Sequence, residues 1–166
     1  MKALRWISLG ALLVFLNGCG GYSFTGIQTD AKTVQVKYFQ NTAPLVEPGI
    51  ERIFTNKLQE AIQNQTRLSL TSSNGDLVYE GEIVDYRVSP MTSTANFTAA
   101  QNRLTITVLV KFTNANKEDE NFEKRFSFFQ DYEGNAQLTG SKLTEVVDFI
   151  FNRITQDIIN ESLAKW

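Results

Sequence analysis

Hydrophobic and polar residues alternate in several stretches of the chain, as they do in strands that bury one face. The first stretch, 33–39, places Val34, Val36 and Tyr38 on one face and polar residues on the other. The cleanest alternation runs over 103–112, where every second residue is a large apolar one. The same reasoning predicts further strands at 68–70, 77–88 and 122–132.

Two other segments show helical spacing of apolar residues. The first begins at Ile50, shortly after Pro48, which suits the entry to a helix. The second recurs from Leu143 to near the C-terminus, and either Thr139 or Ser141 can cap it. Each pattern predicts an amphipathic helix with one buried face.

The connections between these elements carry turn and loop signals. Asn74-Gly75 tolerates positive φ, so we expect a tight turn there that closes a hairpin between the two flanking strands. Pro90–Gln101 is polar and unpatterned, which predicts a flexible loop, and 114–120 predicts a charged hairpin turn. Gly81 lies inside its strand and predicts a bulge or bend.

The order of predicted elements is β-α-β-β-β-β-α. A right-handed crossover through the first helix makes the strands on either side of it parallel, whereas tight turns make the later neighbours antiparallel. The economical solution is a two-layer α+β fold, with two helices packed on one face of a four- to five-stranded mixed sheet. The other sheet face is then uncovered unless a partner covers it.

The N-terminus has the pattern of an export signal. Lys2 and Arg5 precede an apolar run, 6–16, which is too short to span a bilayer as a lone helix. The run ends in Leu16-Asn17-Gly18-Cys19, which resembles the lipobox of bacterial lipoproteins, with Asn17 as the one imperfect position. This resemblance implies cleavage after Gly18 and attachment of lipid to Cys19, the only cysteine in the chain.

We therefore expect a signal peptide at 1–18, a lipid-anchored tether and start of the fold at 19–30, and a single domain at 31–166. Acyl chains such as palmitate would hold the protein on a membrane durably, because two or more chains anchor stably. Gly20, in place of the Asp that retains lipoproteins in the inner membrane, implies the outer membrane, with the domain facing the periplasm. The alternative is an ordinary signal peptide followed by a free cysteine.

Composition argues against several classes of function. The chain has no histidine, so it lacks the commonest metal ligand and the commonest general base near neutral pH. Its 18 acidic residues outnumber its 16 basic ones, which disfavours nucleic acid as a partner. The acidic run Glu118–Glu120 lacks the alternating spacing of a calcium loop, and there is no glycine-rich phosphate loop. We predict no catalytic residue, metal or cofactor, and hence no enzyme.

What remains is a surface argument. Five basic residues on the long strands or at their ends could meet an anionic ligand such as the phosphates of a glycolipid, although solvated strand charges explain them equally well. Phe129 lies on the opposite strand face from Phe126 and Phe128, as a partner contact or as part of a two-sided core. The five basic residues are Arg87, Arg103, Lys111, Lys124 and Arg125.

Taken in order, a set of short motifs resembles the LptE family of lipopolysaccharide-assembly lipoproteins over nearly the whole mature chain. No single motif is decisive, and the order and spacing of the set carry the resemblance. The motifs are Cys19-Gly20-Gly21-Tyr22-Ser23-Phe24, Val36-Lys37-Tyr38-Phe39-Gln40-Asn41, Ala43-Pro44-Leu45-Val46, Gln65-Thr66-Arg67-Leu68, Gly75-Asp76-Leu77, Glu80-Gly81-Glu82-Ile83, Asn102-Arg103-Leu104-Thr105-Ile106 and Phe129-Gln130-Asp131-Tyr132.

The resemblance implies a non-catalytic subunit of the lipopolysaccharide translocon. Such a subunit sits within and against the large outer-membrane β-barrel LptD, and assists its assembly and the insertion of lipopolysaccharide into the outer leaflet. The partners implied are an LptD-like barrel, lipopolysaccharide and the membrane that holds the lipid anchor. Two alternatives stay open, a generic envelope lipoprotein that binds a soluble ligand or peptidoglycan, and an anchored enzyme of unusual chemistry.

Overall fold

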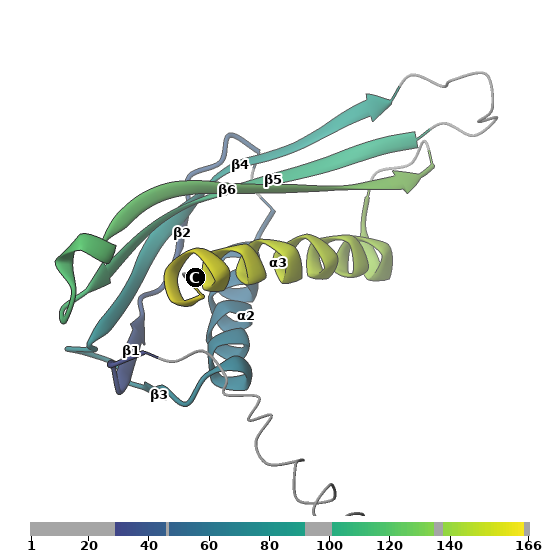
Figure 1. Ribbon diagram of the computed structural model, residues 1–166. Helices are drawn as coiled ribbons and strands as arrows, with labels where there is room; N and C mark the ends of the chain where they lie inside the picture. Colours follow the sequence, from purple (N-terminus) through teal and green to yellow (C-terminus); the bar gives the residue numbers. More distant parts are fainter. Residues whose placement is uncertain (1–28, 46, 92–100, 135–137, 165–166) are drawn as a thin grey trace, which may run out of the picture.

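The computed structural model describes residues 29–45, 47–91, 101–134 and 138–164. These residues form two layers, a long curved sheet and two helices on one side of it (Figure 1). The helices are α2 (Ile50–Gln65) and α3 (Gly140–Leu163), close to the segments that the spacing of apolar residues predicts. Among the helices described, none is both long and apolar enough to cross a membrane.

The described sheet is mixed, as predicted, and has six strands, because residues 40–41, for which the sequence pattern predicts no strand, form a short one. The order is β3-β1-β4-β5-β6, with β2 paired to β4 beside this path. β1 is parallel to both β3 and β4, and β4, β5 and β6 form an antiparallel meander. The strands are β1 (Thr33–Val36), β2 (Gln40–Asn41), β3 (Ser69–Leu70), β4 (Leu77–Met91), β5 (Gln101–Asn114) and β6 (Phe122–Glu133).

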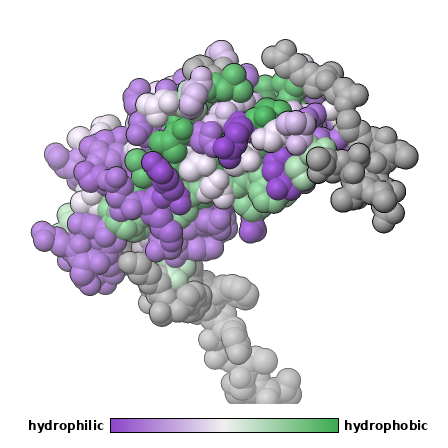
Figure 2. Space-filling view, turned by 90° about the horizontal axis from the view of Figure 1, so that it is seen from above, coloured by the Kyte–Doolittle hydropathy of each residue, from purple (hydrophilic) through white to green (hydrophobic). Residues whose placement is uncertain are grey.

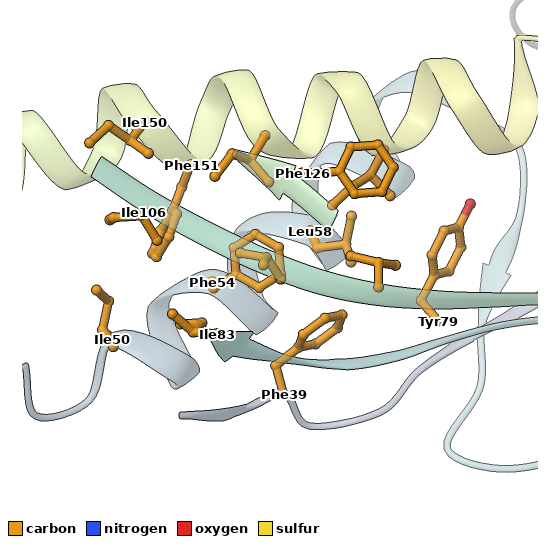
Figure 3. Close-up of a cluster of buried hydrophobic side chains, with 14 of the residues drawn as sticks. Phe39, Ile50, Phe54, Leu58, Tyr79, Ile83, Ile106, Phe126, Ile150 and Phe151 are labelled. Carbon is orange, nitrogen blue, oxygen red and sulfur yellow. The ribbon is translucent and has the colours of Figure 1, made fainter. Parts of the chain in front are cut away.

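The core lies between the helices and the sheet face that they cover (Figure 3). Its centre is a chain of edge-on aromatic contacts from Phe39 through Phe54 to Phe151, with ring centroids 4.9 and 5.0 Å apart. The alternating apolar residues of β5, Leu104 to Phe112, are all buried on this face. The strand period predicted from the sequence is therefore the one that builds the core.

The alternation fails at the end of β1. Val34 and Val36 are buried as predicted, but Tyr38 is 51% exposed and Phe39 is fully buried in its place. The reason is that β1 ends at Val36 and the chain resumes as β2 only at Gln40, so the phase of alternation changes across the break.

The expected hairpin between 68–70 and 77–88 is also wrong. Asn74 does adopt positive φ, at 53°, but β3 pairs with β1 and not with β4. The connection instead carries the chain across β1, and Gly75 comes so close that a Cβ there would lie 2.6 Å from the backbone nitrogen of Gln35. A turn signal is local, whereas the choice of strand partner depends on β1.

Two details of the long strands differ from expectation. The irregularity of β4 falls between Ile83 and Asp85, while Gly81 pairs in register with Val110. The predicted loop Pro90–Gln101 is shorter, because Pro90 and Met91 belong to β4 and Gln101 belongs to β5. Met91 pairs with Gln101, and Pro90 pairs with Asn102. The remaining residues of that loop lie outside the described ones. Thr139 occupies the cap position of α3, without a side-chain capping bond.

Candidate functional site

The face of β4, β5 and β6 that points away from the helices is the candidate binding surface, and we call it the outer face. No described helix or strand covers it (Figure 1), and seen from above the molecule is mostly hydrophilic with scattered apolar groups (Figure 2). Its residues alternate with the buried ones along each strand. They include Glu80, Glu82, Asp85, Arg87, Arg103, Thr105, Thr107, Leu109, Lys111, Glu123, Arg125, Ser127, Phe129, Asp131 and Glu133.

One end of the outer face carries a two-bond ion pair across β5 and β6. Arg103 donates to both carboxylate oxygens of Asp131, from Nε at 2.6 Å and from Nη2 at 2.9 Å, and its guanidinium lies 3.7 Å from the ring centroid of Phe129. This bonding raises the pKa of Arg103 and lowers the pKa of Asp131. The guanidinium is thus held over an exposed aromatic ring.

The other end centres on Glu80, whose carboxylate receives Lys37 Nζ at 2.6 Å and Lys111 Nζ at 3.0 Å. The two lysines, Lys37 first, lower the pKa of Glu80. Beside this group lies an open hollow of about 380 Å³, bordered by Gly81 and Leu109 among others. The hollow carries both signs of charge, which suits contact with a protein surface better than capture of a single anion.

The structure divides the five predicted basic residues between two faces. Arg87, Arg103, Lys111 and Arg125 share the outer face, but Lys124 faces α3 and binds Glu161 at 2.7 Å. Lys124 is two residues from the buried Phe126 on the same strand, so their side chains lie on the same face. This spacing could have placed Lys124 on the helix side from the sequence.

Acidic residues compensate most of the outer-face cations. Arg87 lies 3.5 Å from Asp85, and Arg103 and Lys111 have the partners given above. Within the described chain, Arg125 is the outer-face cation that makes no ion pair. The arrangement is a mixed-charge surface rather than a continuous basic patch, so it favours a protein partner over a polyanion.

Phe129 is 44% exposed on the outer face, so the two-sided-core alternative is wrong for this residue. Phe126 is buried on the helix side, and Phe128 is partly buried there with its ring 6.1 Å from that of Phe149. Phe129 is therefore available as a contact.

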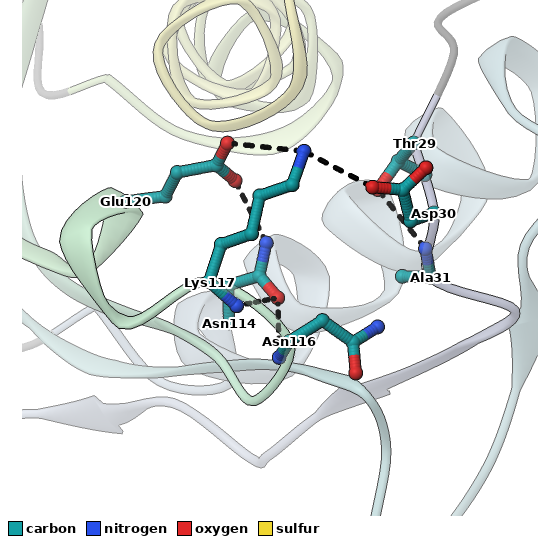
Figure 4. A network of polar contacts seen from close by, with 7 residues as sticks. All are labelled: Thr29, Asp30, Ala31, Asn114, Asn116, Lys117 and Glu120. Atoms are coloured by element: carbon teal, nitrogen blue, oxygen red, sulfur yellow. Dashed lines mark hydrogen bonds and ion pairs between the residues drawn. The ribbon is translucent and has the colours of Figure 1, made fainter.

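The acidic run Glu118–Glu120 forms a single 3-10 turn between β5 and β6. A buried residue that the sequence analysis missed, Asn114, organises it: its Oδ1 accepts from the backbone N–H groups of Asn116 and Lys117, and its Nδ2 donates to Glu120. Lys117 also reaches Asp30 at 3.1 Å, which ties this turn to the start of the domain (Figure 4).

No cluster of potential metal ligands occurs among the residues described. Cys19 lies outside them.

A two-layer domain whose longest strands leave one mixed-charge face uncovered has the form of a binding or assembly protein. The family model described as lipopolysaccharide-assembly, LptE, matches residues 31–162. The chain therefore belongs to the LptE family, in agreement with the motifs of its sequence.

No curated protein sequence matches the chain. Among solved structures, a protein from Xanthomonas campestris has a TM-score of 0.54 at 8% identity, covering 84% of this chain and 87% of its own. A hypothetical protein from Chlamydia trachomatis has a TM-score of 0.50 at 9% identity, covering 81% and 99%. The rare lipoprotein B from Shewanella oneidensis has a TM-score of 0.41 at 14% identity, covering 76% and 89%. At these identities, the first two matches concern the fold alone.

Proposed function

We propose that this protein is a non-catalytic, lipid-anchored subunit of the lipopolysaccharide translocon, which docks within an LptD-like outer-membrane β-barrel and assists its assembly and the insertion of lipopolysaccharide. The observation that carries the proposal is the match of the lipopolysaccharide-assembly family model to residues 31–162. This range covers both helices and every described strand, with only the last residue of α3 outside it.

The outer face supports this role by its chemistry. Most of its cations have an acidic partner, and a pair of hydroxyl groups, Thr107 and Ser127, lies 2.9 Å apart between the charged ends. A surface of this kind offers hydrogen bonds and charge pairs to another protein, and stays soluble before that protein is met. The barrel would cover the sheet face that the two helices leave open.

The anchor is the second part of the proposal. The apolar run and the sequence Leu16-Asn17-Gly18-Cys19 support attachment of lipid to Cys19 and a place on the periplasmic side of the outer membrane. A tether at 19–30 would then join the lipid to the domain. It would keep the domain near any barrel in the same membrane, which raises their effective concentration.

The experiment is a detergent pull-down of the tagged, full-length protein from its own outer membranes, with mass spectrometry of the proteins that stay bound. Recovery of a large β-barrel near one to one is the expected result. A lipoprotein that runs alone under these conditions would contradict the translocon proposal and favour the generic envelope lipoprotein.

Two matched variants test which layer contacts the barrel. Thr107→Arg places a long charged side chain at the centre of the outer face and is expected to lower barrel recovery severalfold. Gln63→Arg introduces the same charged side chain on the exposed side of α2 and is expected to leave recovery within about twofold. Equal recovery with both variants would show that the outer face is not the contact surface.

A further inference from the structure

β6 has a long free edge that pairs with no described strand, and along it the backbone carbonyl of Asp131 accepts from the side chain of its neighbour Gln130 at 3.1 Å. β6 ends the sheet and has 12 residues, whereas β3, at the other end, has two. Two bonds at the end of β5 show which way its backbone groups point. The N–H of Ala115 donates to the backbone carbonyl of Asp76, on the β4 side, and the N–H of Asn114 donates to the side-chain oxygen of Asn121, on the β6 side. Because the bonding direction alternates along a strand, even-numbered residues of β5 and β6 bond each other. Odd-numbered residues of β6, the outer-face set, therefore direct their backbone groups to the free edge.

This edge lacks the usual protection at its centre. Exposed edge strands commonly carry charges or proline that prevent pairing with other chains. Between Arg125 and Asp131, however, β6 has neither, and its residues there are mainly aromatic. Exposed rings flank the edge on both sides, Phe129 on the outer face and Phe149, 47% exposed, on α3.

The sequence of β6 is complementary to itself about Phe129. In an antiparallel pair of two β6 strands related by a two-fold axis at Phe129, each Arg125 lies opposite the Glu133 of the other strand. Both residues direct their backbone groups to the free edge, and neither makes an ion pair within the described chain. The same register places the two Phe129 rings opposite each other, on the same face, where cross-strand aromatic pairs are favourable.

We propose that two copies of this protein associate through their β6 edges, antiparallel and centred on Phe129, into a continuous sheet. A strand pair of about nine residues buries less surface than a standard stable interface, so the dimer is weak and depends on concentration. The proposal goes beyond the barrel-docking role and rests on β6 and its neighbours alone.

Charge reversal tests the register. The full-length protein is purified in detergent without a barrel partner, and its association is measured by sedimentation over a range of concentrations. Arg125→Glu is expected to weaken dimerisation by about tenfold, because two charge pairs become repulsive. The double variant Arg125→Glu with Glu133→Arg is expected to restore it. Arg87→Glu, on the same face but on β4, serves as the control and is expected to change nothing.

Cysteine cross-linking tests the geometry. Phe129→Cys places two thiols directly across the two-fold axis, where the Cα separation of an antiparallel hydrogen-bonded pair suits a disulfide. Ser127→Cys moves each thiol two residues from the axis, too far for a bond. Disulfide-linked dimers with Phe129→Cys but not with Ser127→Cys are the expected result, and both variants carry the same Cys19.

Ser127→Pro removes one backbone donor at the free edge and leaves the backbone bonds between β5 and β6 intact. It also removes the Ser127 hydroxyl that bonds Thr107 of β5 at 2.9 Å, so Ser127→Ala, which loses the hydroxyl and keeps the backbone N–H, is the matched control. Ser127→Pro is expected to abolish the dimer while melting within a few degrees of the parent. A parent chain that stays monomeric at every concentration, or a double charge reversal that fails to restore association, would overturn the proposal. A Ser127→Pro variant that loses only the barrel would also overturn it, by assigning the edge to the barrel.

Discussion

Asp76 and Thr33 bond each other in both directions. The Asp76 carboxylate accepts the backbone N–H of Thr33 at 2.9 Å, and the Thr33 hydroxyl accepts the backbone N–H of Asp76 at 2.9 Å. The same carboxylate oxygen also accepts the backbone N–H of Lys32 at 2.8 Å. This link holds the start of β1 beside the start of β4, although the two residues are 43 positions apart.

Replacing this carboxylate should destabilise the domain and weaken its response to acid. The bonds from Lys32 and Thr33 lower the pKa of Asp76 from its ordinary value of 3.8. A depressed pKa in the folded state gives stability that is present above the unfolded value and is lost as the pH falls through the folded one. We expect Asp76→Asn to lower the melting temperature at pH 7. We also expect the melting temperature of this variant to fall less than that of the parent between pH 7 and pH 3. Asp119→Asn, on the exposed 3-10 turn, is the control, and an equal change in both variants would contradict this account.

Gly81→Ala should be more damaging than its small size suggests. A Cβ at Gly81 would collide with the carbonyl oxygen of Leu109 and lie 2.9 Å from Cε1 of Phe39. Because backbone cannot yield easily, we expect a loss of about 3 kcal/mol in the free energy of unfolding. Gly140→Ala meets open space and should cost only about 1 kcal/mol, for its positive φ of 61°. Urea denaturation of both variants measures the difference, and a parent-like Gly81→Ala would contradict the close approach.

The buried hydroxyl pair of Tyr79 and Ser162 should respond asymmetrically. Their oxygens are 2.7 Å apart, and the Ser162 hydroxyl also donates to the carbonyl of Ile158 at 2.7 Å. Tyr79→Phe leaves Ser162 with a partner and should cost about 1 kcal/mol. Ser162→Ala leaves the tyrosine hydroxyl buried and unbonded, and should cost about 2 kcal/mol. Denaturant unfolding decides the order, and a reversed order would show that the tyrosine hydroxyl has another partner.

Cys19→Ala should abolish lipid attachment and leave a precursor that retains residues 1–18. Without the sulfur there is no site for the diacylglycerol thioether, and cleavage after Gly18 depends on that modification. Intact mass measurement of the membrane and soluble fractions tests this. Detection of normally cleaved and acylated protein in the variant would disprove the lipobox interpretation.

Sequence periodicity predicts the long strands and both helices because their side chains alternate between a buried and an exposed face in a fixed period. It also predicts that Phe129 and Phe126 lie on different faces of their strand, which the structure confirms. The uncovered sheet face follows from the element order alone. These features depend on local spacing, which a single sequence contains.

Sequence analysis failed where a partner distant in the chain decides the structure. The Asn74-Gly75 turn is real, but pairing of β3 with β1 in place of β4 depends on residues more than 30 positions away. The grouping of Lys124 with the outer cations failed for a different reason. A residue's charge does not indicate which strand face it occupies, whereas its even spacing from Phe126 puts Lys124 on the helix side, where it binds Glu161.

The position of β1 between β3 and β4 also constrains the order in which the sheet can form. Synthesis from the N-terminus presents β1 first, but both of its strand neighbours lie in 69–79. Until that segment has emerged, β1 has no strand to pair with, and the loop that must close spans α2. β1 therefore cannot complete its pairing until residues up to 79 are available, so the first strand of the chain is among the last to be fixed in the sheet.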